Sequence, residues 1–355
     1  MRAGARSAVR MLLVAGPAAL VLSLPAATLR PRPAAAAASE PIRLRIGTIA
    51  PENTPWADAL REIKERIERE SGGRIRVTLY LGGIRGAESE MLTEVLRGKL
   101  HAAGLSNGTI ATLVPAFQVL ELPFLLRTPE EADHVIDRVI GPELERLALD
   151  KGLYLALWSE NGWRSIATRS RPVRHPDDVR GLKVRAQESP VNVSFWKALG
   201  AEPVRIPLDE VLSALQTGVV EGYDQTPVYM TAAGWHTQIR YLTLTRHIYQ
   251  PAALVFSRRY LDSLPEELRA IVLARSRQVT LQSRAAIRQA NRELIEVLAA
   301  EGAQIIEPSP EALEAFEARS APVYEELREA IGGEVIDRVR AALAEFRARQ
   351  APGAQ

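Results

Sequence analysis

The stretch from Gly181 to Pro227 constrains the fold more than any other part of the chain, because strand and helix signals alternate in it at short intervals. Apolar and charged residues alternate over 182–185, which predicts a strand. Ser189 and Pro190 then predict a helix start, with Ser189 as the N-cap and the proline in the first turn. The same signals recur, so the stretch predicts strand, helix, strand, helix and strand. In open α/β sheets of this kind, ligands bind at the carboxyl ends of the strands.

Arg185 and the loop of residues 223–226 follow two of these strands, so both are expected at that edge of the sheet. A guanidinium group can bind a carboxylate through two parallel hydrogen bonds, and it stays charged at ordinary pH. Judged from the residues alone, a solvated or structurally paired arginine is the commoner reading of such a position. A carboxylate-binding arginine is the alternative.

The letters GLKVRAQESP, followed by FWKALGAEPVRIPLDEVLSALQTGVVEGYDQTP, resemble the extracytoplasmic solute-binding proteins of TRAP transporters, the DctP-type family. The resemblance extends from about Leu44 to about Val339, and its central motif is long and ordered. It implies an α/β, two-lobed fold of the periplasmic-binding-protein type, in which a long helix spans both lobes. It also implies that the protein captures a small organic acid between the lobes and delivers it to the membrane subunits of a TRAP transporter.

The resemblance assigns the ligand carboxylate to Arg185, which matches the arginine of the family's first motif. A second family arginine follows an Asn-Gly pair, and here Arg164 follows Asn161-Gly162. Arg164 therefore has two readings, a pocket residue or one half of a salt bridge inside the second lobe.

Tyr223, Asp224 and Gln225 depart from the Asn-Pro that many relatives have at this place. Gln225 keeps an amide on a longer side chain, and Tyr223 adds an aromatic face and a hydroxyl. Asp224 would repel an anionic ligand unless it binds a cation or points away. These differences argue against inheriting a relative's ligand unchanged.

Further candidates are an aromatic residue beside Arg164 and polar residues on loops of the first lobe. Aromatic rings with polar edges suit ligands that have an apolar body. Each such ring is nevertheless more often part of a core. These ligand-binding candidates are Trp163, Glu52, Asn53 and Asn107.

Residues 1–38 have the layout of a secretory signal peptide, with a basic start, an apolar run of about 14 residues and small residues before residue 39. The run is too short for a membrane span, which needs roughly 20 apolar residues. Residues 1–38 contain five arginines and no acid, so the formal charge of +2 leaves 40 basic and 43 acidic residues beyond them, about −3. We therefore expect a periplasmic protein without a nucleic-acid partner.

The remaining residues, roughly 315, exceed the usual size of one domain. We expect lobe I over 39–161 with 251–290, lobe II over 162–250 with 291–349, and a disordered tail over 350–355. Separate strands are expected at Tyr154–Trp158 and Ser165–Thr168, and again at Tyr241–Thr245 and Leu254–Ser257. No Gly or Pro occurs over 266–301, which predicts one helix of about 36 residues, or two with a break near Ser283.

The residue patterns give no support for catalysis. The five histidines are scattered without the spacing of metal ligands, there is no cysteine, and no GxSxG motif is present. We therefore expect no enzyme activity, no cofactor and no metal, and a monomer or weak dimer. An exported enzyme on a similar two-lobed frame, or the binding protein of an ABC importer or sensor kinase, are the alternatives.

Overall fold

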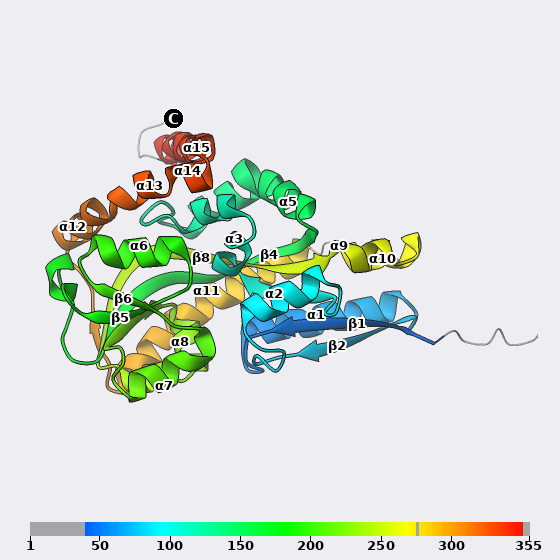
Figure 1. Ribbon diagram of the computed structural model, residues 1–355, viewed down its shortest axis with the longest axis horizontal. Helices are drawn as coiled ribbons and strands as arrows, with labels where there is room; N and C mark the ends of the chain where they lie inside the picture. Colours follow the sequence, from blue (N-terminus) through cyan, green and yellow to red (C-terminus); the bar gives the residue numbers. More distant parts are fainter. Residues whose placement is uncertain (1–39, 275–276, 351–355) are drawn as a thin grey trace, which may run out of the picture. The chain divides into compact units, whose positions relative to one another are not determined.

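The computed structural model describes residues 40–274 and 277–350, and the described residues from 41 onward form one compact unit. Its centre is a nine-stranded sheet in which the strands lie in the order β2-β1-β3-β8-β4-β7-β5-β6, with β9 paired to β8 (Figure 1). Helices flank the sheet, and the fold is the two-lobed α/β arrangement that the sequence predicts. The predicted signal peptide lies outside the described residues, and the predicted lobe boundaries stay a prediction.

One end of the sheet is built from β1 (Ile42–Thr48), β2 (Ile75–Tyr80) and β3 (Ala102–Ser106), with α1 (Pro55–Glu70) and α2 (Glu88–Leu96) between them. β1 pairs in parallel with both of its neighbours. The Thr54 hydroxyl accepts a hydrogen bond from the Ala57 N–H, and Pro55 occupies the first turn, so this helix begins with a strong cap.

The other end contains β5 (Lys183–Ala186), β6 (Glu202–Arg205) and β7 (Gly222–Gln225). The predicted order of strands and helices in the central stretch is confirmed. The helices between and after these strands are α6 (Pro190–Ala198), η4 (Leu208–Glu210), α7 (Val211–Gln216), α8 (Pro227–Ala232) and η5 (Trp235–Gln238). Ser189 does stand at the N-cap of α6, but its hydroxyl makes no capping hydrogen bond.

Two long antiparallel strands, β4 (Leu153–Thr168) and β8 (Tyr241–Ser257), run through the middle of the sheet. The prediction of four short strands here was wrong. Gly162 and Pro251 look like strand breakers, but the paired strands accommodate them at shifts in register, one of which lies between Glu160 and Gly162. Gly162 has φ +99°, a value that favours glycine at such an irregularity.

The prediction of one unbroken helix over 266–301 was also wrong. α10 (Glu266–Leu273) ends before Ala274, whose extended ψ of 106° breaks the helix, and α11 (Arg277–Ala300) follows. The break is therefore not near Ser283, which lies inside α11 and is buried. α11 contacts α1, β4, α8 and β9, so this helix spans the two lobes, as the resemblance implies.

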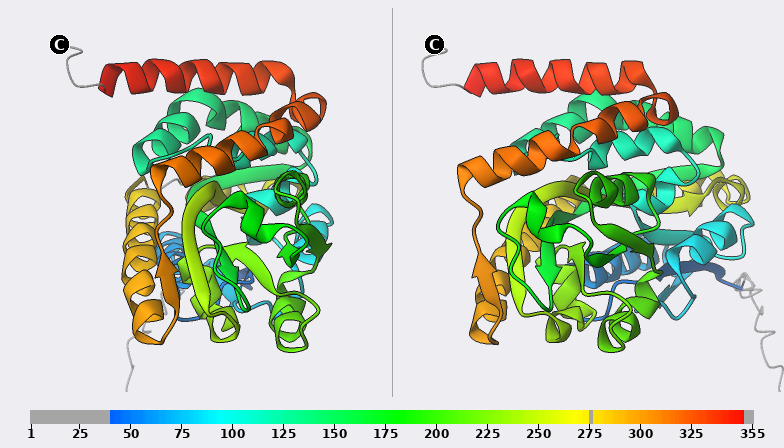
Figure 2. Two further views of the ribbon diagram at one scale, coloured as in Figure 1. Left: turned by 90° about the vertical axis from the view of Figure 1, so that its left-hand side faces the viewer. Right: turned by 60° about the vertical axis from the view of Figure 1, so that its left-hand side comes forward.

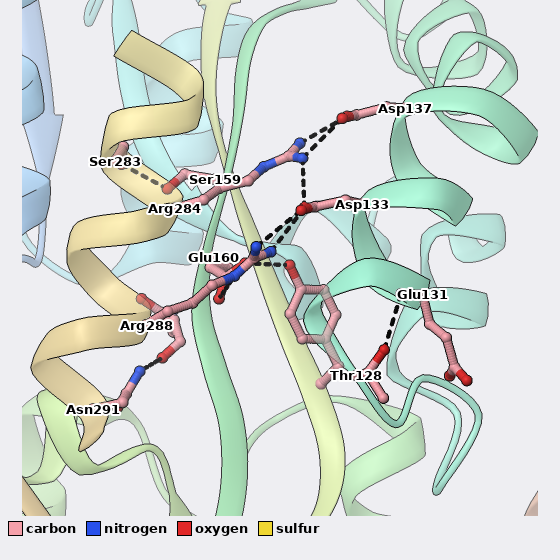
Figure 3. Close-up of polar contacts among 12 residues, drawn as sticks. Thr128, Glu131, Asp133, Asp137, Ser159, Glu160, Ser283, Arg284, Arg288 and Asn291 are labelled. Atoms are coloured by element: carbon pink, nitrogen blue, oxygen red, sulfur yellow. Dashed lines mark hydrogen bonds and ion pairs between the residues drawn. The ribbon is translucent and has the colours of Figure 1, made fainter. Parts of the chain in front are cut away.

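Ion pairs hold α11 against β4 and the helices that follow residue 128 (Figure 3). Arg284 binds Asp133 and Asp137, at 2.9 Å each. Arg288 binds Asp133 at 2.7 Å and the fully buried Glu160 at 2.6 Å. Burial raises the pKa of Glu160 above its ordinary value even beside Arg288.

We expect Arg288→Met to lower the free energy of unfolding by about 2 kcal/mol, because it leaves the buried Glu160 carboxylate with the Tyr249 hydroxyl as its remaining partner. Denaturant unfolding followed by circular dichroism measures the change. Arg292→Met, at an exposed position one turn later on the same helix, is the control and is expected to change stability by less than about 0.5 kcal/mol. Equal losses in both variants would contradict the assigned role of Arg288.

C-terminal helices pack on the side of the sheet where α5 lies (Figure 2). α15 contacts η2, and α14 contacts η1. The helices are interrupted at Gly332, and Gln350, predicted to begin the tail, is the last residue of α15. Residues 351–355 lie outside the described part. The remaining elements are α3 (Asn107–Ala111), η1 (Pro115–Glu121), α4 (Pro129–His134), η2 (Val135–Ile140), α5 (Gly141–Asp150), η3 (Pro176–Val179), α9 (Arg258–Asp262), β9 (Gln304–Ile306), α12 (Pro310–Ser320), α13 (Pro322–Glu326), α14 (Arg328–Ile331) and α15 (Gly333–Gln350).

None of the helices in the described part of the chain has both the length and the apolar character that crossing a membrane requires.

Candidate functional site

Arg185 lies on β5, directly opposite Tyr223 of the neighbouring strand β7. Its side chain is 1% exposed. The Nε–H donates to the Ile206 carbonyl at 3.0 Å, and the guanidinium carbon lies 5.4 Å from the centre of the Trp235 ring. Nη1 has no hydrogen-bond partner, and no carboxylate among the described residues forms an ion pair with this arginine.

The lack of a direct ion pair is the most informative property of Arg185, because the negative charges of Asp224 and Glu188 offset only part of the cost of burying it. Burial, together with the nearby positive charge of Arg164, lowers the pKa of Arg185 to about 10. The group therefore still carries its charge at neutral pH. An uncompensated buried charge is costly, and structures normally avoid one unless another molecule supplies the opposite charge.

Arg164, on β4, is fully buried but is paired with Asp224. Its Nε–H donates to the Asp224 carboxylate at 2.5 Å, and Nη2 donates to the Asp224 carbonyl at 2.6 Å. Nη1 donates to the side-chain oxygens of Gln187 at 3.0 Å and Gln225 at 3.4 Å. Of the two readings of Arg164, the structure contains the salt bridge.

Asp224 is surrounded by donors rather than aimed at open space. Besides Arg164, it contacts Trp196 Nε1 at 3.0 Å and His247 Nε2 at 3.3 Å. Burial alone would raise its pKa, but Arg164 and His247 outweigh that effect and hold the pKa of Asp224 far below its ordinary value. This carboxylate is neutralised inside the protein and does not oppose an anionic ligand.

A chain of hydrogen bonds leads from Arg164 to the opposite lobe. Gln187 accepts from Arg164 and from Gln250 Nε2, and its own Nε2 lies 3.4 Å from the Ser106 hydroxyl. Ser106 in turn donates to Glu88 on α2, at 2.5 Å. Burial raises the pKa of Glu88, although these hydrogen bonds and the charge of Arg185 oppose the rise.

Several buried polar atoms at this edge of the sheet have no hydrogen-bond partner within the described residues. Native proteins leave few such atoms unpaired, and a cluster of them indicates that something else binds there. Ser189 follows β5 by three residues, and Thr226 directly follows β7, so both lie near Arg185 along the paired strands. Besides Arg185 Nη1, the unpaired atoms that we assign to this edge are Ser189 Oγ, Thr226 Oγ1 and both amide atoms of Asn192.

A small cavity of about 40 Å³ lies next to this polar edge, with walls from both ends of the sheet. The residues after β1, with Trp56 of α1, form one wall, and Val228 and Tyr229 of α8 form the other. The Tyr229 ring packs edge-on against Trp235, with 5.4 Å between the ring centres, and Trp235 carries Arg185 on its face. Arg185 does not line the cavity itself. It packs on the Trp235 ring, which packs against Tyr229, and Tyr229 lines the cavity.

The other predicted site residues differ in their surroundings. Tyr223 is fully buried opposite Arg185, and its hydroxyl has no partner within the described residues. Trp163 packs against Tyr249 and donates its indole N–H to the Leu126 carbonyl. Glu52 and Asn53 are exposed and do not line the cavity. Asn107 is buried, donates to the Phe117 carbonyl and keeps an unpaired Oδ1.

Sequence reasoning missed Glu88, Gln187 and Ser189 as residues of the site, and it placed Thr226 at this edge without assigning it a role. One signal was available for Gln187, because a residue two positions after Arg185 on a strand points to the same face. The two hydroxyls were hidden, since each precedes a proline that opens a helix and so reads as a cap.

The arrangement can bind an anion, but it offers no recognisable catalytic unit. Within the described residues, no group of three or more His, Cys, Asp or Glu side chains could hold a metal ion. At the site, Asp224 contacts His247, and both side chains are fully buried. The same carboxylate is paired with Arg164. Burial lowers the pKa of His247, although the neighbouring Asp224 carboxylate opposes this shift.

Residues 46–330 match the family model described as bacterial extracellular solute-binding protein, family 7, DctP. A solute-binding protein of Verminephrobacter eiseniae is 30% identical over 309 residues, 87% of this chain and 91% of that protein. The C4-dicarboxylate-binding periplasmic protein of Rhodobacter capsulatus is 28% identical over 87% of this chain and 93% of its own length. The crystal structure of a sugar acid binding protein from Advenella mimigardefordensis with galactonate is similar, with a TM-score of 0.83, 27% identity and coverage of 86% of this chain and 99% of that one.

Proposed function

This chain belongs to family 7 of the bacterial extracellular solute-binding proteins, the DctP family, and we propose that it captures a small organic acid at Arg185 for a TRAP transporter. The observation that carries the proposal is the buried, charged guanidinium of Arg185 with an unpaired Nη1. A ligand carboxylate would supply the missing negative charge and accept the unpaired hydrogen bonds.

The periplasm is the proposed location, through residues 1–38 acting as an export signal. The proposed partners are the membrane subunits of the transporter. Two of the relatives named above bind organic acids according to their names, a C4-dicarboxylate in one case and galactonate in the other. Binding favours the closed arrangement of the lobes only to the extent that the ligand binds that arrangement more tightly.

Isothermal titration of the purified protein with carboxylic acids and with their neutral amides tests the proposal. We expect binding of the acid and at least about a hundredfold weaker binding of the matched amide, because only the acid supplies a counter-charge. Equal binding of both would contradict the proposal. Recovery of the unchanged acid, checked by proton NMR after prolonged incubation, separates a binding protein from an exported enzyme.

A further inference from the structure

The cavity next to Arg185 has walls of two kinds, and this difference bears on which acid it can hold. Most of its lining is apolar, including Ile49, Pro51 and Leu105 on one side and Val228 on the other. The Trp56 ring also faces it, while the indole N–H is used elsewhere, donating to the Glu160 carbonyl at 3.0 Å and the Asn161 side chain at 3.1 Å.

Three polar side chains of this lining, Thr48, Thr54 and Glu88, already have partners inside the protein. Thr48 accepts from the Ala50 N–H at 3.2 Å, and Thr54 donates to the Pro51 carbonyl at 2.8 Å. Glu88 accepts from Ser106 and from Thr109, the latter at 2.7 Å. Hydroxyl groups of a ligand placed against this wall would lose water and gain few hydrogen bonds in return, which disfavours them.

A second carboxylate is disfavoured for a separate reason. No Lys, Arg or His belongs to the lining, and Arg164 is already neutralised by Asp224. Glu88 does belong to it, so a second negative charge in the cavity would face a carboxyl group instead of a cation.

The unpaired polar atoms belong to the other end of the site. Arg185, Ser189, Asn192 and Thr226 have such atoms, and none of these four residues belongs to the cavity lining. Thr226 is two residues before Val228, so the polar and apolar surfaces meet at the start of α8. Tyr229 adds one hydroxyl between them. The charge of Glu88 raises the pKa of this hydroxyl, and the charge of Arg185 lowers it.

We propose that this site selects a monocarboxylate with a compact apolar body, such as a branched aliphatic acid, over polyhydroxylated acids and dicarboxylates. The carboxylate would bind Arg185, and the hydrocarbon part would fill the cavity beside Trp56 and Val228. This inference rests on the proposed function, because it takes Arg185 as the carboxylate-binding residue.

Isothermal titration with pairs of acids of equal carbon number tests the selection. One pair is 4-methylpentanoate and galactonate, with six carbons each, and the other is butanoate and succinate, with four. We expect the apolar monocarboxylate of each pair to bind at least about tenfold more tightly. Burying one unpaired hydroxyl or charge of the competing acid weakens its binding by about tenfold or more.

Val228→Thr keeps the shape of the side chain and adds a hydroxyl to the apolar wall. We expect this variant to bind 4-methylpentanoate more weakly than the wild type, by about threefold or more, and to narrow its preference over galactonate. Val219→Thr, at a position that is 51% exposed, is the matched control and should change neither value.

The outcomes separate this inference from the proposed function. Tighter binding of galactonate or succinate that still depends on Arg185 would overturn the selection and leave the proposed function intact. Absence of binding by every acid, or binding that survives Arg185→Gln unchanged, would overturn both. If Val228→Thr preferred 4-methylpentanoate over galactonate as strongly as the wild type, the apolar cavity wall would not be the cause of that preference.

Discussion

Arg185→Met is expected to abolish the binding of organic acids while making the ligand-free protein more stable. The loss of affinity should be at least about a hundredfold, because removing one partner of a buried charge pair costs about 2–5 kcal/mol. The gain in stability follows from the unpaired Nη1 and the absent counter-charge, which methionine does not have. We expect the free energy of unfolding to rise by about 1 kcal/mol or more.

Titration calorimetry and denaturant unfolding of the same preparations measure the two effects. Arg185→Lys keeps the charge without the two-pronged geometry, so we expect it to retain part of the affinity. Arg146→Met is the control, because that side chain is 63% exposed and pairs with Asp150 on the same helix. Full affinity in Arg185→Met would disprove the role of this residue, and a large loss of stability would show that the protein needs it to fold.

Arg164→Met and Asp224→Leu are each expected to destabilise the protein by about 3–5 kcal/mol, because each leaves its former partner buried without a counter-charge. Both side chains are fully buried, which distinguishes them from surface pairs worth about 0–1 kcal/mol. Unfolding by denaturant measures each loss. The double variant should lose less than the sum of the two single variants, since it contains neither unpaired charge.

The same pair predicts how stability depends on pH. The pKa of Asp224 is far lower in the folded protein than its ordinary value. The unfolded chain therefore takes up this proton first as pH falls, and the stabilisation present above about pH 4 is lost progressively below it. Asp224→Leu should lose less of its free energy of unfolding on acidification than the wild type.

In the double variant, a loss of stability equal to the sum of the two single losses would show that Arg164 and Asp224 do not act as a pair.

Much of the fold follows from local signals in the sequence. The Ser189-Pro190 pair and the alternation over 182–185 correctly predicted a helix start and a strand. The breaks were harder to predict. Asn161-Gly162 and Pro251 interrupt the pattern but not the strands, because pairing between β4 and β8 overrides local preference. Conversely, the helix ends at Leu273 without any glycine or proline to indicate it.

The site was only partly accessible from the sequence. Arg185 was identified through the resemblance, and its place at the carboxyl end of a strand agrees with the structure. Whether Arg185 has an ion-pair partner depends on packing between distant segments of the chain. It therefore cannot be predicted from the residues next to Arg185 in the sequence. For the same reason, the sequence left open whether Asp224 repels a ligand, since Arg164 lies 60 residues away along the chain.

The continuity of β4 and β8 through the whole sheet means that neither lobe is a separable module. The strands β4 and β8 form the middle of the sheet and belong to both lobes, and the chain passes between the lobes repeatedly. A fragment cut at residue 161 would expose half a ladder of unsatisfied amide and carbonyl groups, the kind of edge along which proteins aggregate. Divergence within such a scaffold is therefore easiest in the side chains that face the ligand and hardest in the order of the strands.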